Sequence, residues 1–284
     1  MSKRFACHLA LAASALLLAA ACSSDGGDDG ASGSTTTASE TPPSTTSTTE
    51  AATVLRILVT NDDGFDSEGI DTLVQALAAL DDTEVTVVAP AGEQSGTGDS
   101  TSDGPVTATD GTTLSGYPAT AVEGTPGDSV NYAFDELGLE FDLVISGVNS
   151  VQNIGPLSEI SGTVGAAKTA ARRGVPAIAA SADTIEPPYD VAVDEVLIQV
   201  GARRGNLAGA GVGAGLPTVL SINAPFCEGG ANPGPPVDVP TATDAGDRDA
   251  FGGSDCDSGV TDFADDIDAF LNGYVSVSEV STAA

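Results

Sequence analysis

The spacing of hydrophobic and polar positions changes in a regular way along the chain. Apolar residues recur at helical spacing between residues 69 and 80, at Ile70, Leu73, Val74, Leu77 and Leu80. Short apolar runs of strand length stand before and after this segment, and they occupy the ranges 55–60, 84–90, 141–149 and 175–181. Strands that alternate with helices predict βαβ units, and therefore a parallel sheet with right-handed crossovers.

Two further helices and a hairpin are predicted in the same part of the chain. The range 125–137 is typical of a helix, because Thr125 is a plausible cap and Pro126 suits the first turn. A second helix is predicted over 161–174. The range 106–124 combines Asp-Gly turn signals with β-rich flanks, which favours a hairpin.

The pattern weakens from residue 182 onward. We expect a helix over 189–204, a strand over 217–225, a short helix or turn over 261–273 and a terminal strand over 274–280. The segment between the last strands, from Cys227 to Asp257, is acidic and predicted to be loop. The fold class predicted for a domain over 54–284 is therefore α/β: a Rossmann-like, doubly wound, mostly parallel sheet with an irregular C-terminal arm.

The first residues of the chain resemble an export signal. Residues 1–22 begin with Lys3 and Arg4 and continue as an apolar Ala/Leu run, and they end in Cys22 as a bacterial lipobox does. We expect lipidation of Cys22 and anchoring at the extracytoplasmic side of the envelope, with the lipid as the only membrane contact. Ordinary cleavage with an incidental thiol is the alternative. Residues 23–53 are rich in Gly, Ser, Thr and Pro, which predicts a disordered linker.

The charge balance excludes some classes of partner. The chain has 41 acidic and 9 basic residues, for a formal net charge of −32, and removal of Lys3 and Arg4 with the signal makes this −34. Such a surface repels nucleic-acid polymers. The one histidine, His8, lies in the predicted signal. Histidine-based triads and histidine-ligated zinc are therefore excluded for the processed protein.

Once the signal is removed with its Cys7, two cysteines remain apart from Cys22. In an oxidising compartment Cys227 and Cys256 are candidates for a disulfide, and two unrelated thiols are the alternative.

Polar residues follow three of the predicted parallel strands. Asp62 and Asp63 come after the first strand, Ser95 and Gly96 after the second, and Asn149 ends the third. The carboxyl ends of such strands meet where ligands bind in open α/β sheets. All the groups offered are oxygen donors, which suit one divalent ion, Mg²⁺ or Mn²⁺ and also Ca²⁺, and the ion would offset the repulsion between the adjacent carboxylates. Turn or cap roles are the structural alternative.

A helix start supplies a possible anion site beside these oxygens. Ser161, Gly162 and Thr163 open the helix predicted over 161–174, and free N–H groups at a helix N-terminus bind phosphate. Asn61 and Gly96 are the other candidates for phosphate contact. Ordinary N-capping is the alternative for the two hydroxyls.

Five motifs occur in an order that resembles the SurE family, the survival-protein type of metal-dependent 5′-nucleotidase. They are "ILVTNDDGFDSEGI", "VVAPAGEQSG", "EGTPGDSV", "DLVISGVNSVQN" and "SGTVGAA", and the resemblance covers roughly residues 55–181. It implies hydrolysis of nucleoside monophosphates, metal ligation by Asp62, Asp63, Ser95 and Asn149, and a homodimer or higher homo-oligomer through the C-terminal arm.

Departures from the family pattern fall on loops. Asp99 and Asp103 follow the Ser95 motif, Val151 stands where the family has glycine, and "GPLSEI" precedes the helix start. The prediction is an extracytoplasmic phosphomonoesterase with Asp62 or Asp63 as general base, acting on nucleoside 5′-monophosphates or another phosphomonoester. The alternative is an envelope lipoprotein of the same fold that binds metal and nucleotide with weakened catalysis.

Overall fold

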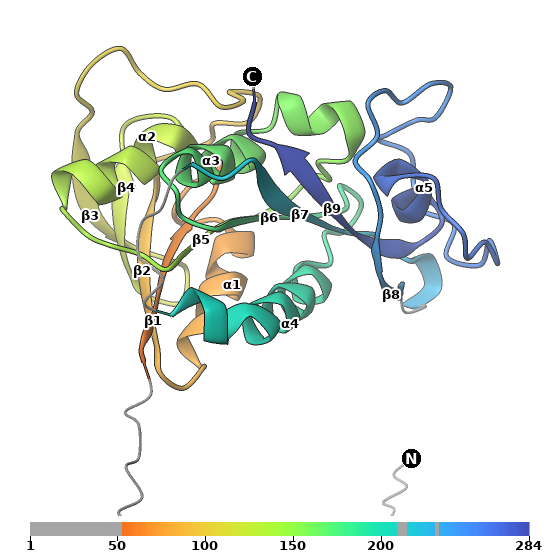
Figure 1. Ribbon diagram of the computed structural model, residues 1–284, viewed down its shortest axis with the longest axis horizontal. Coiled ribbons are helices and arrows are strands. Elements are labelled where there is room, and N and C mark those ends of the chain that lie inside the picture. Colours follow the sequence, from red (N-terminus) through yellow and green to blue (C-terminus); the bar gives the residue numbers. More distant parts are fainter. Residues whose placement is uncertain (1–52, 209–214, 231–232, 284) are drawn as a thin grey trace, which may run out of the picture. The chain divides into compact units, whose positions relative to one another are not determined.

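The computed structural model describes residues 53–208, 215–230 and 233–283 (Figure 1). The predicted signal, its Cys22 and all but the last residue of the predicted linker lie outside these ranges. Among the described residues, no helix is long and apolar enough to cross a membrane.

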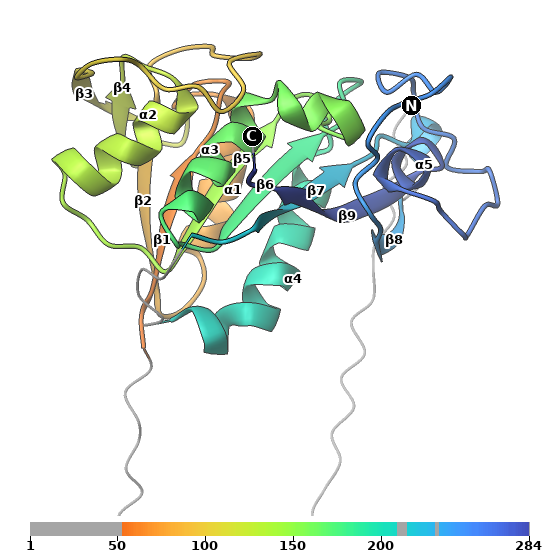
Figure 2. The same cartoon turned by 45° about the horizontal axis from the view of Figure 1, so that its top comes forward.

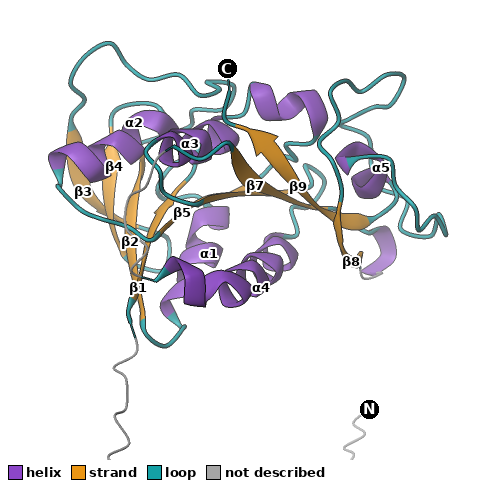
Figure 3. Ribbon diagram, in the orientation of Figure 1, coloured by secondary structure: helices purple, strands orange, loops and turns teal. Residues whose placement is uncertain are grey.

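A single mixed sheet of nine strands runs through the described part of the chain (Figure 3). Its strand order is β3-β4-β2-β1-β5-β6-β7-β9-β8, and only the β3/β4 and β7/β9 pairs are antiparallel. The predicted doubly wound, mostly parallel sheet is therefore confirmed. The strands are β1 (Leu55–Thr60), β2 (Thr83–Pro90), β3 (Ala108–Thr112), β4 (Pro118–Val122), β5 (Leu143–Asn149), β6 (Ala177–Ala182), β7 (Thr218–Ala224), β8 (Gly234–Asp238) and β9 (Tyr274–Ser281).

Helices cover both faces of the sheet (Figures 1 and 2). One face packs against α1 and α4, and the other packs against α2 and α3. The central strands are consequently buried on both sides, which explains why they read as continuous apolar runs rather than alternating ones. The helices are α1 (Glu68–Ala78), α2 (Pro126–Asn131), α3 (Gly162–Arg172), α4 (Tyr189–Leu207) and α5 (Asp266–Leu271), with a π-helix at Tyr132–Glu136 and 3₁₀ helices at Gly155–Glu159 and Glu228–Gly230.

Local sequence explains where α2 and α3 begin. The predicted Thr125 cap closes a capping box with Asp128, and Pro126 occupies the first turn of α2. At α3, the Ser161 hydroxyl accepts a hydrogen bond from the Val164 N–H at 3.1 Å. Both helix starts are thus set by short-range hydrogen bonds.

The C-terminal arm is more regular than its sequence indicates. The range Gly234–Asp238 forms β8, parallel to β9, although its Gly-Pro-Pro start is typical of loop. The prediction of loop for these residues was wrong. Proline lacks an N–H, so it is tolerated at a sheet edge such as the one β8 occupies. A small apolar cluster of Ile154, Ala242, Ala250, Ile267 and Phe270 joins the arm to the rest of the domain.

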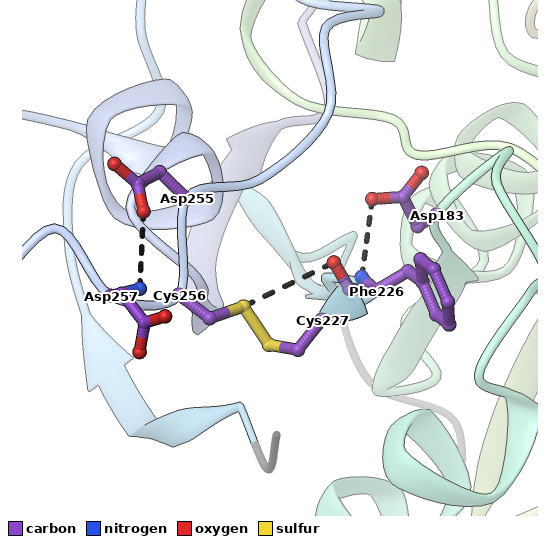
Figure 4. Close-up of a disulfide and its surroundings, with 6 residues drawn as sticks. All are labelled: Asp183, Phe226, Cys227, Asp255, Cys256 and Asp257. Carbon is purple, nitrogen blue, oxygen red and sulfur yellow. Dashed lines mark hydrogen bonds between the residues drawn. A yellow bond between two sulfur atoms is a disulfide. The ribbon is translucent and has the colours of Figure 1, made fainter. Parts of the chain in front are cut away.

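A disulfide closes the arm (Figure 4). It joins Cys227, which follows β7, to Cys256, with 5.7 Å between the two Cα atoms. The bond closes a loop of 29 residues in sequence, so it restricts the unfolded chain as well as the folded one.

Cleavage of this disulfide is expected to lower the free energy of unfolding by about 2–4 kcal/mol, because the open chain regains loop entropy. Urea denaturation of the protein with and without a reductant measures the loss. The Cys227→Ser, Cys256→Ser double variant is the control, and its stability should not respond to reductant. An equal stability of oxidised and reduced wild type would contradict the expectation.

Asp71 ties α1 to the β3–β4 hairpin. Its carboxylate accepts hydrogen bonds from the hydroxyl of Thr113, from the N–H and hydroxyl of Ser115, and from Gln75. Although burial by itself would raise the pKa of Asp71, these hydrogen bonds together hold the pKa below its ordinary value. The ionised form is therefore favoured in the folded protein.

Asp71→Ala is expected to cost about 2–3 kcal/mol of unfolding free energy at neutral pH, because buried donors lose a charged acceptor. The pKa of Asp71 is lower in the folded protein than in the unfolded chain, where it is about 3.9. The stability that the Asp71 carboxylate contributes is therefore fully present above about pH 3.9 and is lost as the pH falls through the pKa of the folded state. Denaturation at pH 7 and pH 3 should show the difference from wild type shrinking in acid. Asp103→Ala, which removes an exposed loop carboxylate, is the matched control.

Candidate metal centre

The direction of winding reverses between β1 and β5, which are parallel neighbours in the sheet. Ligands of open α/β proteins bind outside the carboxyl ends of strands at such a reversal. A cavity of about 140 Å³ lies there, and Asp62, Ser95 and Asn149 all line it. The loops after β1, β2 and β5 therefore converge, as their sequence positions predicted.

Asp62 is the deepest of these residues, with only 2% of its surface exposed. Its carboxylate accepts a short hydrogen bond from the Thr163 hydroxyl and another from the Thr163 backbone. Burial raises the pKa of Asp62 to about 6, opposed by the Thr163 hydroxyl and reinforced by the negative charges of Asp63 and Glu93. The carboxylate thus stands at the N-terminus of α3, where the helix dipole favours negative charge.

Asp63 is adjacent in sequence but differently placed. It is not among the residues that line the cavity, and its two carboxylate oxygens accept hydrogen bonds from the Ser150 N–H and hydroxyl, both at 3.1 Å. Burial raises the pKa of Asp63, and the Ser150 hydrogen bonds oppose that rise. Sequence reasoning missed the role of Ser150, which the motif "SGVNSVQN" places directly after Asn149.

Two amide oxygens near the cavity have no hydrogen-bond partner among the described residues. Asn149 donates from Nδ2 to the Val151 carbonyl at 2.5 Å, and its buried Oδ1 is left without a donor. The Oδ1 of Asn61 is also buried and unpaired. Because burying an unpaired acceptor is costly, each oxygen needs a further partner, and a cation would provide one.

The donor chemistry fits a hard divalent cation. Among the described residues no cluster of three or more His, Cys, Asp or Glu could hold a metal ion, and the cavity lining offers the neutral oxygens of Ser95 and Asn149 beside the Asp62 carboxylate. Besides burial, the charges of Asp63 and Glu93 raise the pKa of Asp62, and the charge of Glu93 raises the pKa of Asp63; a bound cation would relieve that repulsion. The predicted ligand set remains a prediction: Asp62, Ser95 and Asn149 line one cavity, whereas Asp63 does not line it.

Four of the five predicted phosphate contacts divide into two groups, and the fifth, Gly162, is the first residue of α3 and does not line the cavity. Gly96 and Ser161 line the cavity. Asn61 and Thr163 are otherwise engaged: the Asn61 amide donates to the Gly64 carbonyl and the Ser67 hydroxyl, both at 2.8 Å, and the Thr163 hydroxyl donates to Asp62. The hydrogen bonding therefore opposes the prediction that the Asn61 and Thr163 side chains bind phosphate.

Two glycines allow the close packing of this site. A Cβ at Gly162 would lie 2.8 Å from the Asp62 Cβ, so only glycine lets α3 begin against that carboxylate. Gly147, in β5, has a φ of 136° and would bring a Cβ within 2.2 Å of the Ala180 carbonyl. The register of β5 against β6 shifts at this point, immediately before Asn149.

The cavity also has an apolar wall that sequence reasoning did not predict. Val151, Leu157, Ile160 and Phe251 line it, together with Gln152 and Asn153. Phe251 comes from the C-terminal arm, about a hundred residues after Val151, and no local pattern indicates that they meet.

Fold and site together define an α/β protein in which oxygen-bearing side chains, those of Asp62, Ser95 and Asn149, gather at the switch point of the sheet. We call this group the oxygen cage. A family model described as "Survival protein SurE" matches residues 57–248, and the chain belongs to this family.

Relatives of known name support the same assignment. The chain is 44% identical over 144 residues to "5′-nucleotidase SurE 1" of Burkholderia lata, covering 49% of this chain and 54% of that protein. It is 38% identical over 199 residues to "5′-nucleotidase SurE" of Methanocella arvoryzae, covering 65% and 71% of the two chains. The crystal structure of the SurE protein from Aquifex aeolicus has a TM-score of 0.62 and 25% identity, and covers 80% of this chain and 94% of that one. Several of the curated relatives match over only about half of their own length, as the Burkholderia protein does.

Gly162→Ala is expected to weaken binding of Mn²⁺ by about 10- to 100-fold, as loss of support around a metal ligand usually does, because the new Cβ displaces Asp62. Isothermal titration calorimetry with Mn²⁺ measures the affinity, and circular dichroism checks the fold. Gly201→Ala, in exposed helix surface with no atom within 4 Å of the new Cβ, is the control and should bind Mn²⁺ as wild type does. Equal affinities for both variants would count against a site at Asp62.

Proposed function

We propose that this protein is a divalent-metal-dependent phosphomonoesterase that hydrolyses nucleoside 5′-monophosphates to nucleoside and phosphate. The observation that carries the proposal is the convergence of Asp62, Ser95 and Asn149 on one cavity at the switch point of a SurE-family fold. Relatives named 5′-nucleotidase are 44% identical over 144 residues and 38% identical over 199 residues.

Asp62, Asp63, Ser95 and Asn149 are the residues that would hold the ion, which we propose to be Mg²⁺ or Mn²⁺, with Ca²⁺ as a further candidate. When bound, it supplies Lewis acidity and positive charge for the phosphate oxygens. The cavity lining includes no lysine, arginine or histidine, so a phosphomonoester dianion would otherwise meet only negative and neutral groups there. Gly96 and Ser161 border the same cavity and would orient the phosphate.

Because the sequence between residues 53 and 284 contains no histidine, a carboxylate is the strongest candidate for the general base. Asp62 and Asp63 are the candidates. Asp62 lines the cavity, whereas the Asp63 oxygens accept hydrogen bonds from Ser150. Ser150 therefore acts as a positioning residue that holds Asp63 beside the site.

We also propose that the domain works on the extracytoplasmic side of the envelope, anchored through lipid on Cys22. The Cys227–Cys256 disulfide supports this location, since disulfides persist in oxidising compartments. A homo-oligomer formed through the C-terminal arm stays a prediction.

Asp62→Asn is expected to lower metal-dependent phosphate release from adenosine 5′-monophosphate by about 100-fold or more, because it removes a charged metal ligand worth several kcal/mol in the transition state. The assay follows inorganic phosphate with and without Mn²⁺, and with EDTA. Asp66→Asn changes an exposed carboxylate of the same loop and should keep full activity.

The wild-type result separates the proposal from the alternative of a binding protein. Metal-dependent phosphate release that Asp62→Asn abolishes supports the enzyme. Tight binding of Mn²⁺ and nucleotide with no phosphate release would defeat the enzyme and leave the binding protein.

A further inference from the structure

Two large apolar side chains are exposed at the cavity of the candidate metal centre. Ile160 has 59% of its surface exposed and Phe251 has 55%, and both line the cavity that Asp62 and Asn149 line. The other large exposed hydrophobic residues of the described chain lie elsewhere. An apolar pair beside a polar cage is typical of a ligand site, in which apolar contacts bind one part of a ligand and polar groups bind another.

Phe251 is exposed although hydrogen bonds hold the backbone next to it. Gln152, which is fully buried and also lines the cavity, donates from Nε2 to the Ala250 carbonyl at 2.8 Å. The Gln152 Oε1 accepts from the Thr184 N–H at 3.2 Å, so the amide is fixed at both ends. The backbone next to Phe251 is thus held by a residue of the site itself.

Four more interactions anchor the same turn. The Ala250 side chain is buried in the small apolar cluster of the arm. The Asp249 carboxylate accepts from the Phe251 N–H at 3.1 Å, and the Asp249 carbonyl accepts from the Gly252 N–H at 2.9 Å. The Cys227–Cys256 disulfide ties down the chain five residues beyond Phe251 (Figure 4). A fixed backbone therefore presents an aromatic ring that is only partly covered.

The backbone of Ile160 is also held in place by hydrogen bonds. Its N–H donates to the Leu157 carbonyl at 3.2 Å, and its carbonyl accepts from the Gly98 N–H at 3.1 Å. Gly98 belongs to the loop that carries Ser95, so Ile160 is held by the metal-site loop and Phe251 by the arm. Both apolar groups have fixed positions relative to the oxygen cage.

The size of the cavity says which part of a ligand it encloses. At about 140 Å³ it is smaller than the roughly 300 Å³ or more of a pocket that encloses a drug-sized ligand. It suits a phosphate group near Asp62, Ser95 and Asn149. The remainder of a nucleotide must then extend to the rim, where Phe251 and Ile160 stand. A flat base has a π face that stacks on an aromatic ring whatever its hydrogen-bonding pattern.

We propose that Phe251, together with Ile160, forms a stacking platform for the base of the nucleotide, and that Phe251 makes the site prefer nucleotides over phosphomonoesters without a base. This inference rests on the proposed function, because it takes a nucleoside monophosphate as the ligand. Since stacking tolerates every base, the platform selects for the presence of a base rather than for its identity.

The test compares two probes that differ only in the base, adenosine 5′-monophosphate and ribose 5-phosphate. Isothermal titration calorimetry of the full chain, oxidised and with Mn²⁺, measures both affinities. Wild type should bind adenosine 5′-monophosphate more tightly. Phe251→Ala should weaken that binding by about 5- to 100-fold, the range found for loss of one stacked aromatic, and should weaken ribose 5-phosphate binding much less.

Two further variants make the test specific to the ring. Phe251→Tyr keeps an aromatic face and should keep most of the preference for the nucleotide. Leu114→Ala removes another exposed apolar side chain, 64% exposed and not part of the cavity lining, and should change neither affinity. Equal losses for the two probes in Phe251→Ala, an unchanged nucleotide affinity, or no wild-type preference for the nucleotide would overturn the proposal.

Binding separates this inference from the proposed reaction. A wild type that binds the nucleotide in preference to ribose 5-phosphate through Phe251, yet releases no phosphate, would refute the phosphomonoesterase and leave the platform standing. Phosphate released equally well from both compounds, with no dependence of affinity on Phe251, would support the phosphomonoesterase and refute the platform.

Discussion

The buried carboxylate of Asp62 is the constraint around which the site is organised. A charged group with almost no exposure is costly unless other groups stabilise it. Here the stabilising groups are the Thr163 hydroxyl and the N-terminus of α3, and they fix the helix against the end of β1. Gly162 is required at the same point because a side chain there would collide with Asp62. The position of α3, the shape of the cavity and the protonation state of the Asp62 carboxylate consequently depend on one another.

This arrangement also supports the proposal that the site binds a cation. Asp62 and Asp63 are held in place by neutral hydroxyl and backbone donors, none of which cancels their charge, and Glu93 adds a third negative group nearby. The unpaired Oδ1 of Asn149 is directed by the Val151 carbonyl, which binds the other end of the amide. The protein thus builds a rigid set of oxygen ligands whose repulsion a bound ion would relieve.

The C-terminal arm contributes part of the cavity wall at the site. Through Gln152 and the disulfide it brings Phe251 to the cavity, although the arm belongs to the acidic, irregular part of the chain. The family fold supplies the oxygen cage, and the arm supplies part of the wall that a ligand would contact. Differences in ligand preference among proteins of this fold can therefore arise in the arm without disturbing the cage.

The α/β fold, the succession of β1 to β7 with their helices, the starts of α2 and α3, and the convergence of Asp62, Ser95 and Asn149 could all be predicted from the sequence. These follow from local periodicity, from capping, and from the rule that parallel strands end at one edge. Four features could not be predicted and depend on the folded chain: Thr163 and Asn61 donate to Asp62 and to the loop, Ser150 holds Asp63, Gly234–Asp238 pairs as β8, and Phe251 lines the cavity. Each of these depends on contacts between residues whose sequence spacing carries no periodic signal, and a hydrogen bond or an edge pairing is settled by which partner the folded chain brings within reach.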